Sequence, residues 1–581
     1  MNKHIFEFNQ TPSKVNNGPR VQLIRVLLMD ASSQPGTTSE VPDKTGDNSP
    51  RALISVYDKT GATALAVALE SMGWQILSTG GTSRLLKESG VEVMDVSSVT
   101  EHPEVFDGRV KTLHPAIHAP ILARGNNPDD INTLSNLGYP RIDMVVVNLY
   151  PFEEVAARGA EVEMEELIEM VDIGGPTLIR AAAKNHLDVL VLADPSQYDQ
   201  ILNHLQQTDG DPESIPQEVR QQLALIAFQR TAAYDIALSN TLAQRFDGVE
   251  LQGDLPPKLL ISGGKLNRLR YGENPHQIAG FFDSAIVGES KQGLAAAKQH
   301  GGKELSFNNY LDLDAAMRFA RSHCGDDWED WPHCCVIIKH TNACGVAISK
   351  NQVDAWKDAL ASDPESAFGC VIAFNKEVTL EVAEEIGSHF VECIIAPGFE
   401  TTALEKLSEK KNRRMLTISD FSPLNPNLRW RQISGGWLAQ EEGAPIVAWD
   451  EVKCATDNEM NESELNLARF GVAVCAQVKS NCVVFVQPTA TGFATVGIGP
   501  GQTSRVEAVR IAARRAGERA NGAMMVSDAF FPFRDGIDTA NEIGITSVVQ
   551  PGGSIRDQEV IDAANEHGMT MLFTGVRLFR H

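Results

Sequence analysis

The sequence ALISVYDKTGATALAVALESMGWQILSTGGT, residues 52–82, alternates the pattern of a strand with that of a helix. An apolar run at 52–57 is followed by a turn at Asp58 to Gly61, a helical pattern, a second strand at 74–78 and a glycine turn. Strands that alternate with helices of this length are typical of βαβ units, whose consecutive strands run parallel. The stretch therefore predicts a parallel sheet at the start of the folded chain.

The alternation continues beyond this stretch. Residues 141–152 and 186–195 are apolar on both faces, as expected for central strands of a parallel sheet. A long helical pattern at 216–246 gives way to a segment with two prolines and two glycines, which indicates a domain boundary near residue 255. The rest of the chain also mixes strands and helices, without a visible residue-level repeat. We expect a loose extension at 1–50, an α/β domain at 51–255 and a second α/β domain at 256–581.

The composition limits what the protein can bind. The chain has 581 residues and a formal net charge of −25, so its surface as a whole repels nucleic acids and anionic membranes. Any anionic ligand must therefore be held by local clusters of lysine and arginine. The nine cysteines show no CxxC spacing and all lie in the C-terminal half, which favours reduced thiols in the cytoplasm. We expect neither a membrane span nor a signal peptide, because no apolar run is long enough.

Three segments of the first domain have the chemistry of a phosphate site. Residues 78–90, STGGTSRLLKESG, place a glycine pair between a strand end and a helix start, where free N–H groups and the helix dipole attract an anion. Arg109 and Lys111 stand at alternate positions and can face one phosphate together. Residues 172–186, DIGGPTLIRAAAKNH, again place a glycine pair before a helix. A capped tight turn and a solvated basic loop are the alternatives for the first two segments.

Two histidines of the first domain raise the question of a metal. His114 and His118 are four residues apart, a spacing that occurs in zinc-binding helices. Neither an HExxH motif nor a third ligand accompanies them, and Pro115 makes the helical phase uncertain. We therefore expect no metal site here.

In the second domain, residues 335–348, CVIIKHTNACGVAI, place two ionisable groups at the end of a buried strand. The apolar run ends at Lys339, which is followed directly by His340 and a turn. A structural interpretation has Lys339 in water and His340 held by a hydrogen bond. Cys344 follows four residues later, so a Cys–His nucleophile is another alternative.

Several motifs, taken in order, resemble a known family. SVYDKTG, STGGT, GRVKTLHP, NLYPF and DIGGPTLIRAAAKNH are similar to the inosine monophosphate (IMP) cyclohydrolase domain of a bifunctional purine-biosynthesis enzyme family. LRYGENPHQ, KHTNACG, AFG, APG, KSN, SDAFFPFRDGID and RLFRH are similar to its aminoimidazole carboxamide ribonucleotide (AICAR) transformylase domain. The resemblance extends from about residue 52 to the C-terminus. It implies a methylglyoxal-synthase-like parallel-sheet domain, followed by a cytidine-deaminase-like α/β domain with two lobes.

The resemblance also implies site residues. In the first domain it assigns nucleotide binding to Asp58, Lys59, Ser78, Gly80, Gly81, Thr82, Arg109, Lys111, Thr112, Asn148, Asp172 and Ile173, and acid/base catalysis to Lys184. In the second domain it assigns ribonucleotide binding to Arg270, Tyr271, Gly398, Asp420, Arg505, Phe530 and Arg577. It assigns folate binding to Asp535, Ser554 and Ile555, and catalysis to Lys339, His340 and Asn481.

The implied chemistry accounts for the pair at the strand end. The transformylase moves a formyl group from 10-formyltetrahydrofolate to the 5-amino group of AICAR, and the cyclohydrolase then closes formyl-AICAR (FAICAR) to IMP and releases water. The amine is a poor nucleophile, so its proton must leave as it attacks, and a neutral imidazole is suited to take it. We therefore expect His340 to be the general base, with Lys339 keeping it neutral and stabilising the oxyanion. Asn481 would help to place the formyl group or the base.

Two departures and two rival functions complete the expectations. Tyr57 stands where many members have serine, and Ala343 stands where KHxNPxG is common. A zinc nucleobase deaminase is the rival enzyme class, but the sequence has no HxE followed by PCxxC. A non-catalytic nucleotide sensor would not need Lys339, His340 and Lys184. The resemblance further implies a cytoplasmic homodimer that takes folate as cosubstrate and requires no metal, nucleic acid or membrane.

Overall fold

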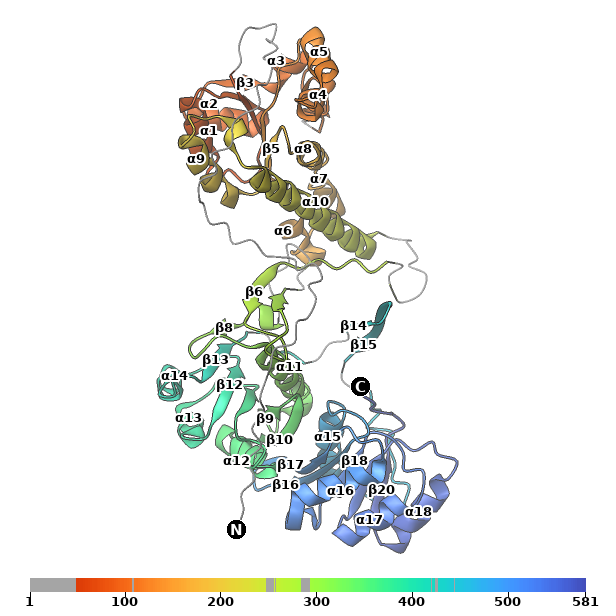
Figure 1. Cartoon of the computed structure of the whole chain (residues 1–581). Helices are drawn as coiled ribbons and strands as arrows, with labels where there is room; N and C mark the ends of the chain where they lie inside the picture. Colours follow the sequence, from red (N-terminus) through yellow and green to blue (C-terminus); the bar gives the residue numbers. More distant parts are fainter. Residues whose placement is uncertain are drawn as a thin grey trace, which may run out of the picture.

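The first part of the chain is built on a five-stranded sheet in which every neighbouring pair is parallel, as predicted. The computed structural model describes residues 49–106, 109–246, 255, 258–283, 293–419, 421–423, 427–443 and 445–581. In the order β3-β2-β1-β4-β5, the strands are β3 (Val93–Asp95), β2 (Gln75–Ser78), β1 (Arg51–Ile54), β4 (Met144–Val146) and β5 (Leu190–Leu192). Figure 1 shows this sheet flanked by helices.

Helices cover the strands of the first sheet, and one buried cluster lies between them. They are α1 (Ala62–Ser71), α2 (Gly80–Glu88), α3 (Val96–Thr100), α4 (Pro115–Leu122), α5 (Pro128–Leu137), α6 (Phe152–Ala156), α7 (Met164–Glu169), α8 (Gly174–Lys184), α9 (Tyr198–Gln206) and α10 (Gln217–Arg245). The helix expected at 216–246 is present as α10. The strands expected at 141–152 and 186–195 are much shorter, because β1 offers only four residues as pairing partners.

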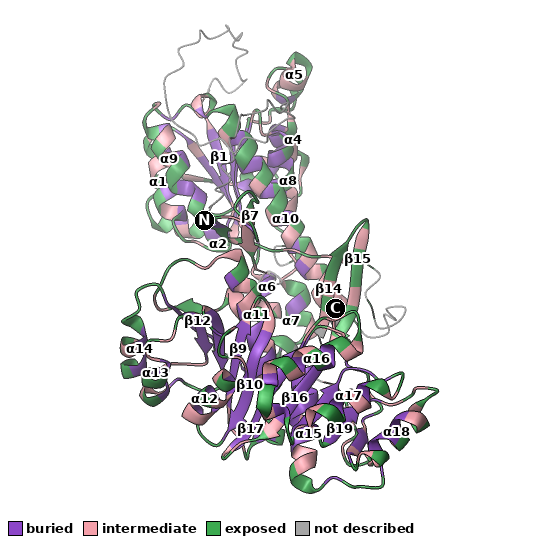
Figure 2. Cartoon of the chain, turned by 60° about the horizontal axis from the view of Figure 1, so that its bottom comes forward, coloured by how far each residue is buried: buried purple, intermediate pink, exposed green. Residues whose placement is uncertain are grey.

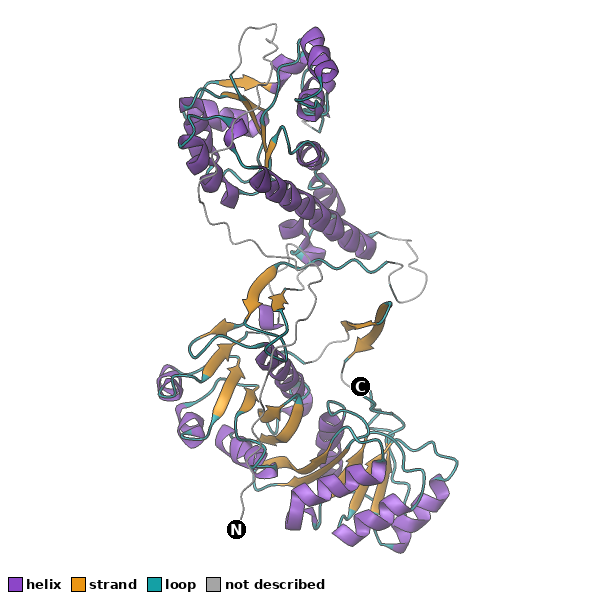
Figure 3. Cartoon of the chain, in the orientation of Figure 1, coloured by secondary structure: helices purple, strands orange, loops and turns teal. Residues whose placement is uncertain are grey.

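The second part of the chain contains one continuous sheet of eleven strands. Their order is β20-β19-β18-β16-β17-β10-β9-β11-β12-β13-β8. The strands are β8 (Lys298–Gln299), β9 (His333–Lys339), β10 (Asn342–Ser349), β11 (Cys370–Phe374), β12 (Val391–Ala396), β13 (Arg414–Thr417), β16 (Val483–Pro488), β17 (Gly492–Gly499), β18 (Met524–Ser527), β19 (Ser547–Gln550) and β20 (Thr570–Phe573). Figure 3 shows helices on both faces of this sheet.

Ten strands of this sheet form two halves with the same order of elements, and β8 pairs with β13 at one end of the sheet. Each half runs helix, antiparallel hairpin, helix, strand, helix, strand, helix, strand. The helices of the first half are α11 (Phe307–Arg321), α12 (Gln352–Ser362), α13 (Leu380–Ile386) and α14 (Thr401–Ser408); those of the second are α15 (Glu462–Cys475), α16 (Arg505–Ala516), α17 (Asp535–Ile543) and α18 (Asp557–Glu566). The two halves meet where β10 pairs antiparallel with β17. The sequence showed no such repeat, because the two halves share their topology without sharing residues.

The side chains of β9 show how the core is divided. Cys334, Val336 and Ile338 belong to a cluster that includes residues of α11 and α15, whereas Cys335 and Ile337 belong to the cluster under α12, α13 and α14. Alternate residues of a strand point to opposite faces, so a strand between two helical layers must be apolar throughout. Figure 2 shows the central strands β9, β10, β16 and β17 of this sheet as largely buried.

Two further hairpins lie outside the large sheets. One is formed by β6 (Lys265–Leu269) and β7 (Ala279–Phe282), and the other by β14 (Asn427–Ile433) and β15 (Gly436–Glu442). The loose extension expected at 1–50 lies outside the described residues except for its last two positions, and the boundary expected near residue 255 is adjoined by undescribed residues on both sides. Within the described ranges, no helix has both the length and the apolar character that crossing a membrane requires.

Gly345 of β10 permits the close approach of α12. A Cβ atom built on Gly345 would overlap the carbonyl oxygen of Ala359 and lie 2.8 Å from Cβ of Ser362. We expect Gly345→Ala to lower the free energy of unfolding by about 1–3 kcal/mol, because α12 must move outward. Urea unfolding followed by circular dichroism measures the change. Gly436→Ala, where a Cβ has open space, is the control, and equal effects of the two substitutions would contradict this packing argument.

Candidate functional site: a phosphate cradle and a histidine turn

The start of α2 forms a cationic cradle in the first domain. Thr79 precedes the helix in an extended conformation without capping it through its side chain, and Gly80 has a φ of 54°. The Lys59 ammonium donates to Oγ1 of Thr82 at 3.1 Å, and Nζ of Lys111 lies 2.7 Å from where a Cβ of Gly80 would be. Burial, followed by the Coulomb effect of Lys111, lowers the pKa of Lys59, although Asp58 opposes this. Two ammonium groups thus converge on a helix N-terminus, which suits a phosphate.

The carboxylate of Glu104 lies in this cradle, although Glu104 was not identified as a site residue from the sequence. Its Oε2 lies 3.3 Å from Nζ of Lys111, and its Oε1 accepts a hydrogen bond from Oγ1 of Thr79 at 2.6 Å. An incoming phosphate would compete with this carboxylate for Lys111. No sequence signal identified Glu104, because it belongs to none of the glycine or lysine motifs.

Several predicted nucleotide-binding residues support the cradle through the backbone. Ser78 is fully buried and donates to the carbonyl of Ile54 at 2.6 Å, so its hydroxyl faces the sheet. Thr82 donates to the carbonyl of Val56 at 3.0 Å. Asn148 accepts from the N–H groups of Tyr57 and Asp58 at 2.6 and 3.0 Å. The three side chains hold β1, β2 and the turn after β1 in one arrangement.

The remaining predicted residues of the first domain lie at the N-terminus of α8 or nearby. Asp172 accepts from the N–H of Gly175 at 2.8 Å, and burial raises the pKa of its carboxyl. Oγ1 of buried Thr112 lies 3.4 Å from where a Cβ of Gly174 would be, and Ile173 is exposed. Arg109 is exposed and forms an ion pair with Glu169. Gly81, with nothing within 4 Å of a built Cβ, leaves the mouth of the cradle open.

Tyr57, the departure from serine, faces Tyr150. The two ring centroids are 5.5 Å apart, and both side chains are partly exposed. Burial raises the pKa of Tyr150, with smaller contributions from Asp172 and Tyr57. Tyr150 is a second residue that sequence reasoning missed, although it belongs to the quoted NLYPF motif.

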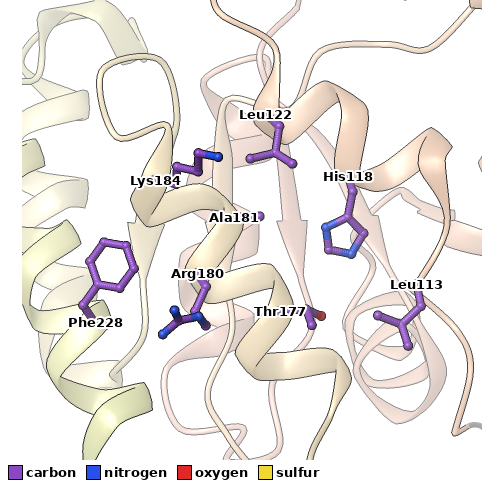
Figure 4. Close-up of a pocket in the computed structure, with 8 residues that line it drawn as sticks. All are labelled: Leu113, His118, Leu122, Thr177, Arg180, Ala181, Lys184 and Phe228. Carbon is purple, nitrogen blue, oxygen red and sulfur yellow. The ribbon is translucent and has the colours of Figure 1, made fainter.

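Lys184 is the last residue of α8. Ten residues separate it from Gly174, and a helix rises 1.5 Å per residue, so their backbones are roughly 15 Å apart. Lys184 lines a pocket of about 560 Å³ together with Leu113, His118, Leu122, Thr177, Arg180, Ala181 and Phe228, drawn in Figure 4. Leu113, which lines the same pocket, lies two residues after Lys111 of the cradle.

The polar groups of this pocket include a neutral histidine. Burial lowers the pKa of His118, whose buried Nε2 has no hydrogen-bond partner among the described residues. The Arg180 guanidinium lies over the ring of Phe228 at 5.6 Å. His114 accepts from the N–H of Ala116 at 3.1 Å and so caps α4. Across the residues that the structure describes, no group of three or more His, Cys, Asp or Glu side chains could hold a metal ion.

In the second domain, Lys339 and His340 lie at a two-residue hairpin turn. Lys339 pairs with Asn342, and His340 and Thr341 between them have φ values of 53° and 59°. A two-residue turn with two positive φ values normally contains glycine or asparagine, and each such residue costs on the order of 1–3 kcal/mol when it has a bulky side chain. The turn leaves His340 exposed, while the Lys339 ammonium donates to the carbonyl of Phe368 at 2.8 Å.

Strand pairing brings Asn481 to the same edge of the sheet as His340, which we call the Lys339 edge. β10 ends at Ser349 on the opposite edge, where it pairs with Gly492 at the start of β17. β17 therefore runs back to the Lys339 edge and ends there at Gly499, which pairs with Val483. Asn481 lies two residues before Val483 and so at this edge. Asn481 accepts from Nη2 of Arg505 at 2.7 Å. Arg505 also forms an ion pair with the fully buried Asp528. Arg505 also donates to Oγ of Ser527 at 2.8 Å, so three partners hold it at the start of α16.

Most of the other predicted residues also lie at the Lys339 edge. Phe530, Asp535, Ser554, Ile555 and Arg577 follow the C-terminal ends of β18, β19 and β20, which run parallel toward it. Ligands of α/β sheets bind outside such strand ends. The Arg270 guanidinium lies 5.6 Å over the ring of Tyr271, and this segment reaches α11 where Nδ2 of Asn308 donates to the carbonyl of Glu273 at 3.4 Å.

Gly398 lies apart from this group. It follows the C-terminal end of β12, and β12 and β11 run from the Lys339 edge to the opposite edge, because β11 is antiparallel to β9. The structure therefore does not bring Gly398 to the pocket of His340 in one chain. Asp420 lies outside the described residues.

Residues at the start of β11 and β12 lie near His340 instead. The segment with Phe368 and Gly369 immediately precedes β11, and Phe368 is exposed beside Lys339. Oε2 of Glu392, the second residue of β12, accepts from Nδ2 of Asn309 at 3.0 Å. No role was assigned to these residues from the sequence; AFG served only for the family resemblance, and the lone acid in the apolar run VECIIA is the signal that could have identified Glu392.

Comparison with known proteins defines the class of enzyme. The model of the AICARFT/IMPCHase bienzyme family matches residues 182–515, and that of the MGS-like domain matches residues 61–177. The chain belongs to the AICARFT/IMPCHase bienzyme family. The resemblance read from the motifs is therefore confirmed, as is the fold class of a parallel-sheet MGS-like domain followed by an α/β domain.

Named relatives cover nearly the whole chain. The chain is 44% identical over 537 residues to the bifunctional purine biosynthesis protein PurH of Persephonella marina, which covers 91% of this chain and 99% of that protein. It is 45% identical over 542 residues to the PurH of Roseobacter denitrificans, covering 91% and 98%. A solved structure described as the crystal structure of ForH is 36% identical, covers 33% of this chain and 97% of that one, and has a TM-score of 0.31.

This membership defines the activities in general terms. The chain is a bifunctional purine biosynthesis enzyme, with an AICAR formyltransferase activity and an IMP cyclohydrolase activity. The formyltransferase implies a folate-type cosubstrate. A non-catalytic sensor is not favoured.

The close contact between Gly80 and Lys111 gives a test of the cradle. We expect Gly80→Ala to raise the KM of the cyclohydrolase for its phosphorylated substrate roughly tenfold or more, because the added Cβ displaces the ammonium from a charge-assisted hydrogen bond. Steady-state cyclisation kinetics measure the change, with formyl transfer by the same variant as the control. An unchanged KM would show that phosphate binds elsewhere.

The Cys–His alternative can be tested through Cys344. Burial raises the pKa of this thiol to about 12, so it is protonated at neutral pH and a poor nucleophile. We expect Cys344→Ala to transfer formyl groups at close to the wild-type rate, measured by folate absorbance. A loss as large as that of His340→Ala would revive the covalent mechanism.

Proposed function

We propose that formyl transfer takes place at the Lys339 edge, with 10-formyltetrahydrofolate as the donor and His340 as the general base. The 5-amino nitrogen of AICAR attacks the formyl carbon, and His340 takes the proton that the amine loses. The observation that carries the proposal is that His340 is exposed on a turn in which it and Thr341 adopt an unfavourable positive φ. Strained backbone of this kind is concentrated at functional sites.

Lys339 and the returning proton complete this step. Addition to the formyl carbon puts negative charge on its oxygen, and the Lys339 ammonium stabilises that charge, a contribution worth about 3 kcal/mol in comparable sites. When the oxyanion collapses, the bond from carbon to N10 of the folate breaks and the proton on His340 passes to N10. The products are FAICAR and tetrahydrofolate. The hydrogen bond from the Lys339 ammonium to the carbonyl of Phe368 supports a position of this ammonium beside the reacting groups.

The second step takes place in the first domain. The carboxamide nitrogen of FAICAR attacks its own formyl carbon, and the ring closes to IMP with loss of water. We propose that the cradle of Lys59, Gly80 and Lys111 holds the phosphate and that Lys184 transfers protons at the reacting end. Because both reacting groups belong to one molecule, correct orientation supplies much of the rate. Arg180 and neutral His118 support a polar reaction in the Lys184 pocket.

We further propose that the enzyme is a cytoplasmic homodimer. All nine cysteines are free thiols, which agrees with a reducing compartment. The hairpin of β14 and β15 exposes half of the Trp437 and Leu438 side chains, and isolated hairpins are marginally stable by themselves. Such a hairpin is better explained by packing against a second subunit. The charge of −25 agrees with small anionic ligands rather than nucleic acid or membrane as partners.

Two substitutions separate the activities. We expect His340→Ala to slow formyl transfer by roughly a hundred- to ten-thousandfold, because it removes general base catalysis. We expect Lys184→Ala to slow cyclisation of FAICAR in the same way. Each variant is assayed for both reactions, so that the spared activity reports correct folding. Loss of both activities in either variant would contradict two separate sites.

A further inference from the structure

The turn at His340 depends on a residue of another element. The N–H of Thr341 donates to Oδ1 of Asp312 at 2.6 Å. Asp312 belongs to α11, which packs beside β9 and β11. Within the hairpin itself, Nδ2 of Asn342 donates to the carbonyl of His340 at 2.9 Å. Asp312 thus ties the turn to α11.

The position of Asp312 is itself well defined. The helix begins with a reciprocal capping box, in which Ser306 accepts from the N–H of Asn309 and Asn309 accepts from the N–H of Ser306. Nδ2 of Asn309 also donates to Glu392 at 3.0 Å, which fastens the start of α11 to β12. Asp312 lies one turn further along the same helix.

A carboxylate at this position is costly, which argues for a specific purpose. Burial is the largest influence on Asp312 and raises the pKa of its carboxyl, while the N–H groups of Thr341 and His340 lower it in part. A solvent-facing helix position would carry no such cost. A half-buried carboxylate needs hydrogen bonds that offset its lost hydration, and here the turn supplies them.

We propose that Asp312 is the positioning residue for His340: by accepting the N–H of Thr341 it holds both turn residues in the left-handed conformation and so aims the imidazole. The inference rests on the proposed function, in which His340 is the base. Without this acceptor, the hairpin is free to relax to turns with lower strain, and the ring direction changes with the backbone. We expect the binding of AICAR and folate to be independent of this contact, because Asp312 is given no direct role in holding either of them.

The test compares Asp312→Ala with Asp312→Asn in the full-length enzyme. The alanine variant removes the acceptor, whereas asparagine keeps an acceptor oxygen at almost the same place. We expect Asp312→Ala to lower kcat of formyl transfer on the order of a hundredfold, since small misplacements of a catalytic group have effects of that size. The KM values for both substrates should stay within about twofold, and Asp312→Asn should recover most of the lost kcat.

The controls separate positioning from folding. Cyclisation of FAICAR by the same variants reports the first domain, and thermal unfolding reports the whole chain. Asp314→Asn is a matched change two residues further along α11, where the carboxylate pairs with Arg318 at 2.8 Å instead of the turn, and it should leave kcat of formyl transfer unchanged.

Each outcome decides for or against the proposal. It is supported if kcat falls, KM does not change and asparagine rescues the alanine variant. It is overturned if Asp312→Ala keeps its kcat, if the effect lies in KM alone, or if asparagine is no better than alanine. His340→Ala is measured in parallel: if that variant still transfers formyl groups, the assignment of the base fails, which is a different result from failure of Asp312 to position it.

Discussion

The pairing of β10 with β17 is the constraint on which the second domain depends. It joins two half-sheets of the same topology through the register Ala347 to Ala494, Ile348 to Phe493 and Ser349 to Gly492. Gly492 is required there, since a Cβ would overlap the carbonyl oxygen of Ile348. β9 pairs with the outer side of β10, and β16 pairs with the outer side of β17. The register of β10 with β17 therefore places the turn after β9 and the start of β16 at the same edge of the sheet. A shift by one residue would reverse which side chains face each helical layer.

The charge distribution explains how an acidic protein can hold anionic substrates. With a net charge of −25, the molecule as a whole repels a phosphate, so attraction must come from groups at short range. In the first domain, Lys59 and Lys111 gather at the start of α2, while Glu104 neutralises part of their charge. In the second domain, Arg505 is held by Asn481 and Asp528 and stands at the start of α16. Both places combine a cation with a helix N-terminus.

Much of the local structure followed from the sequence. The alternation at 52–82 predicted parallel strands, and the apolar run before Lys339 predicted a buried strand, because a strand between two helical layers has no polar face. The motifs identified the family and named the residues at the cradle and at the histidine turn. The positive φ of His340 and Thr341 was not foreseen, because the turn contains neither the glycine nor the asparagine that two-residue hairpin turns prefer. Glu104 and Asp312 were missed for a related reason: their roles come from contacts with residues distant in the sequence.

The sequence by itself determined the type of each domain, the family and the chemical groups available for catalysis, since these depend on residue type and local pattern. Only the tertiary structure decided which of those groups meet. It separated Gly398 from His340, and it revealed the two equivalent halves of the large sheet. The physical reason is that strand register and direction place residues in space, and these follow from packing between segments that lie far apart along the chain.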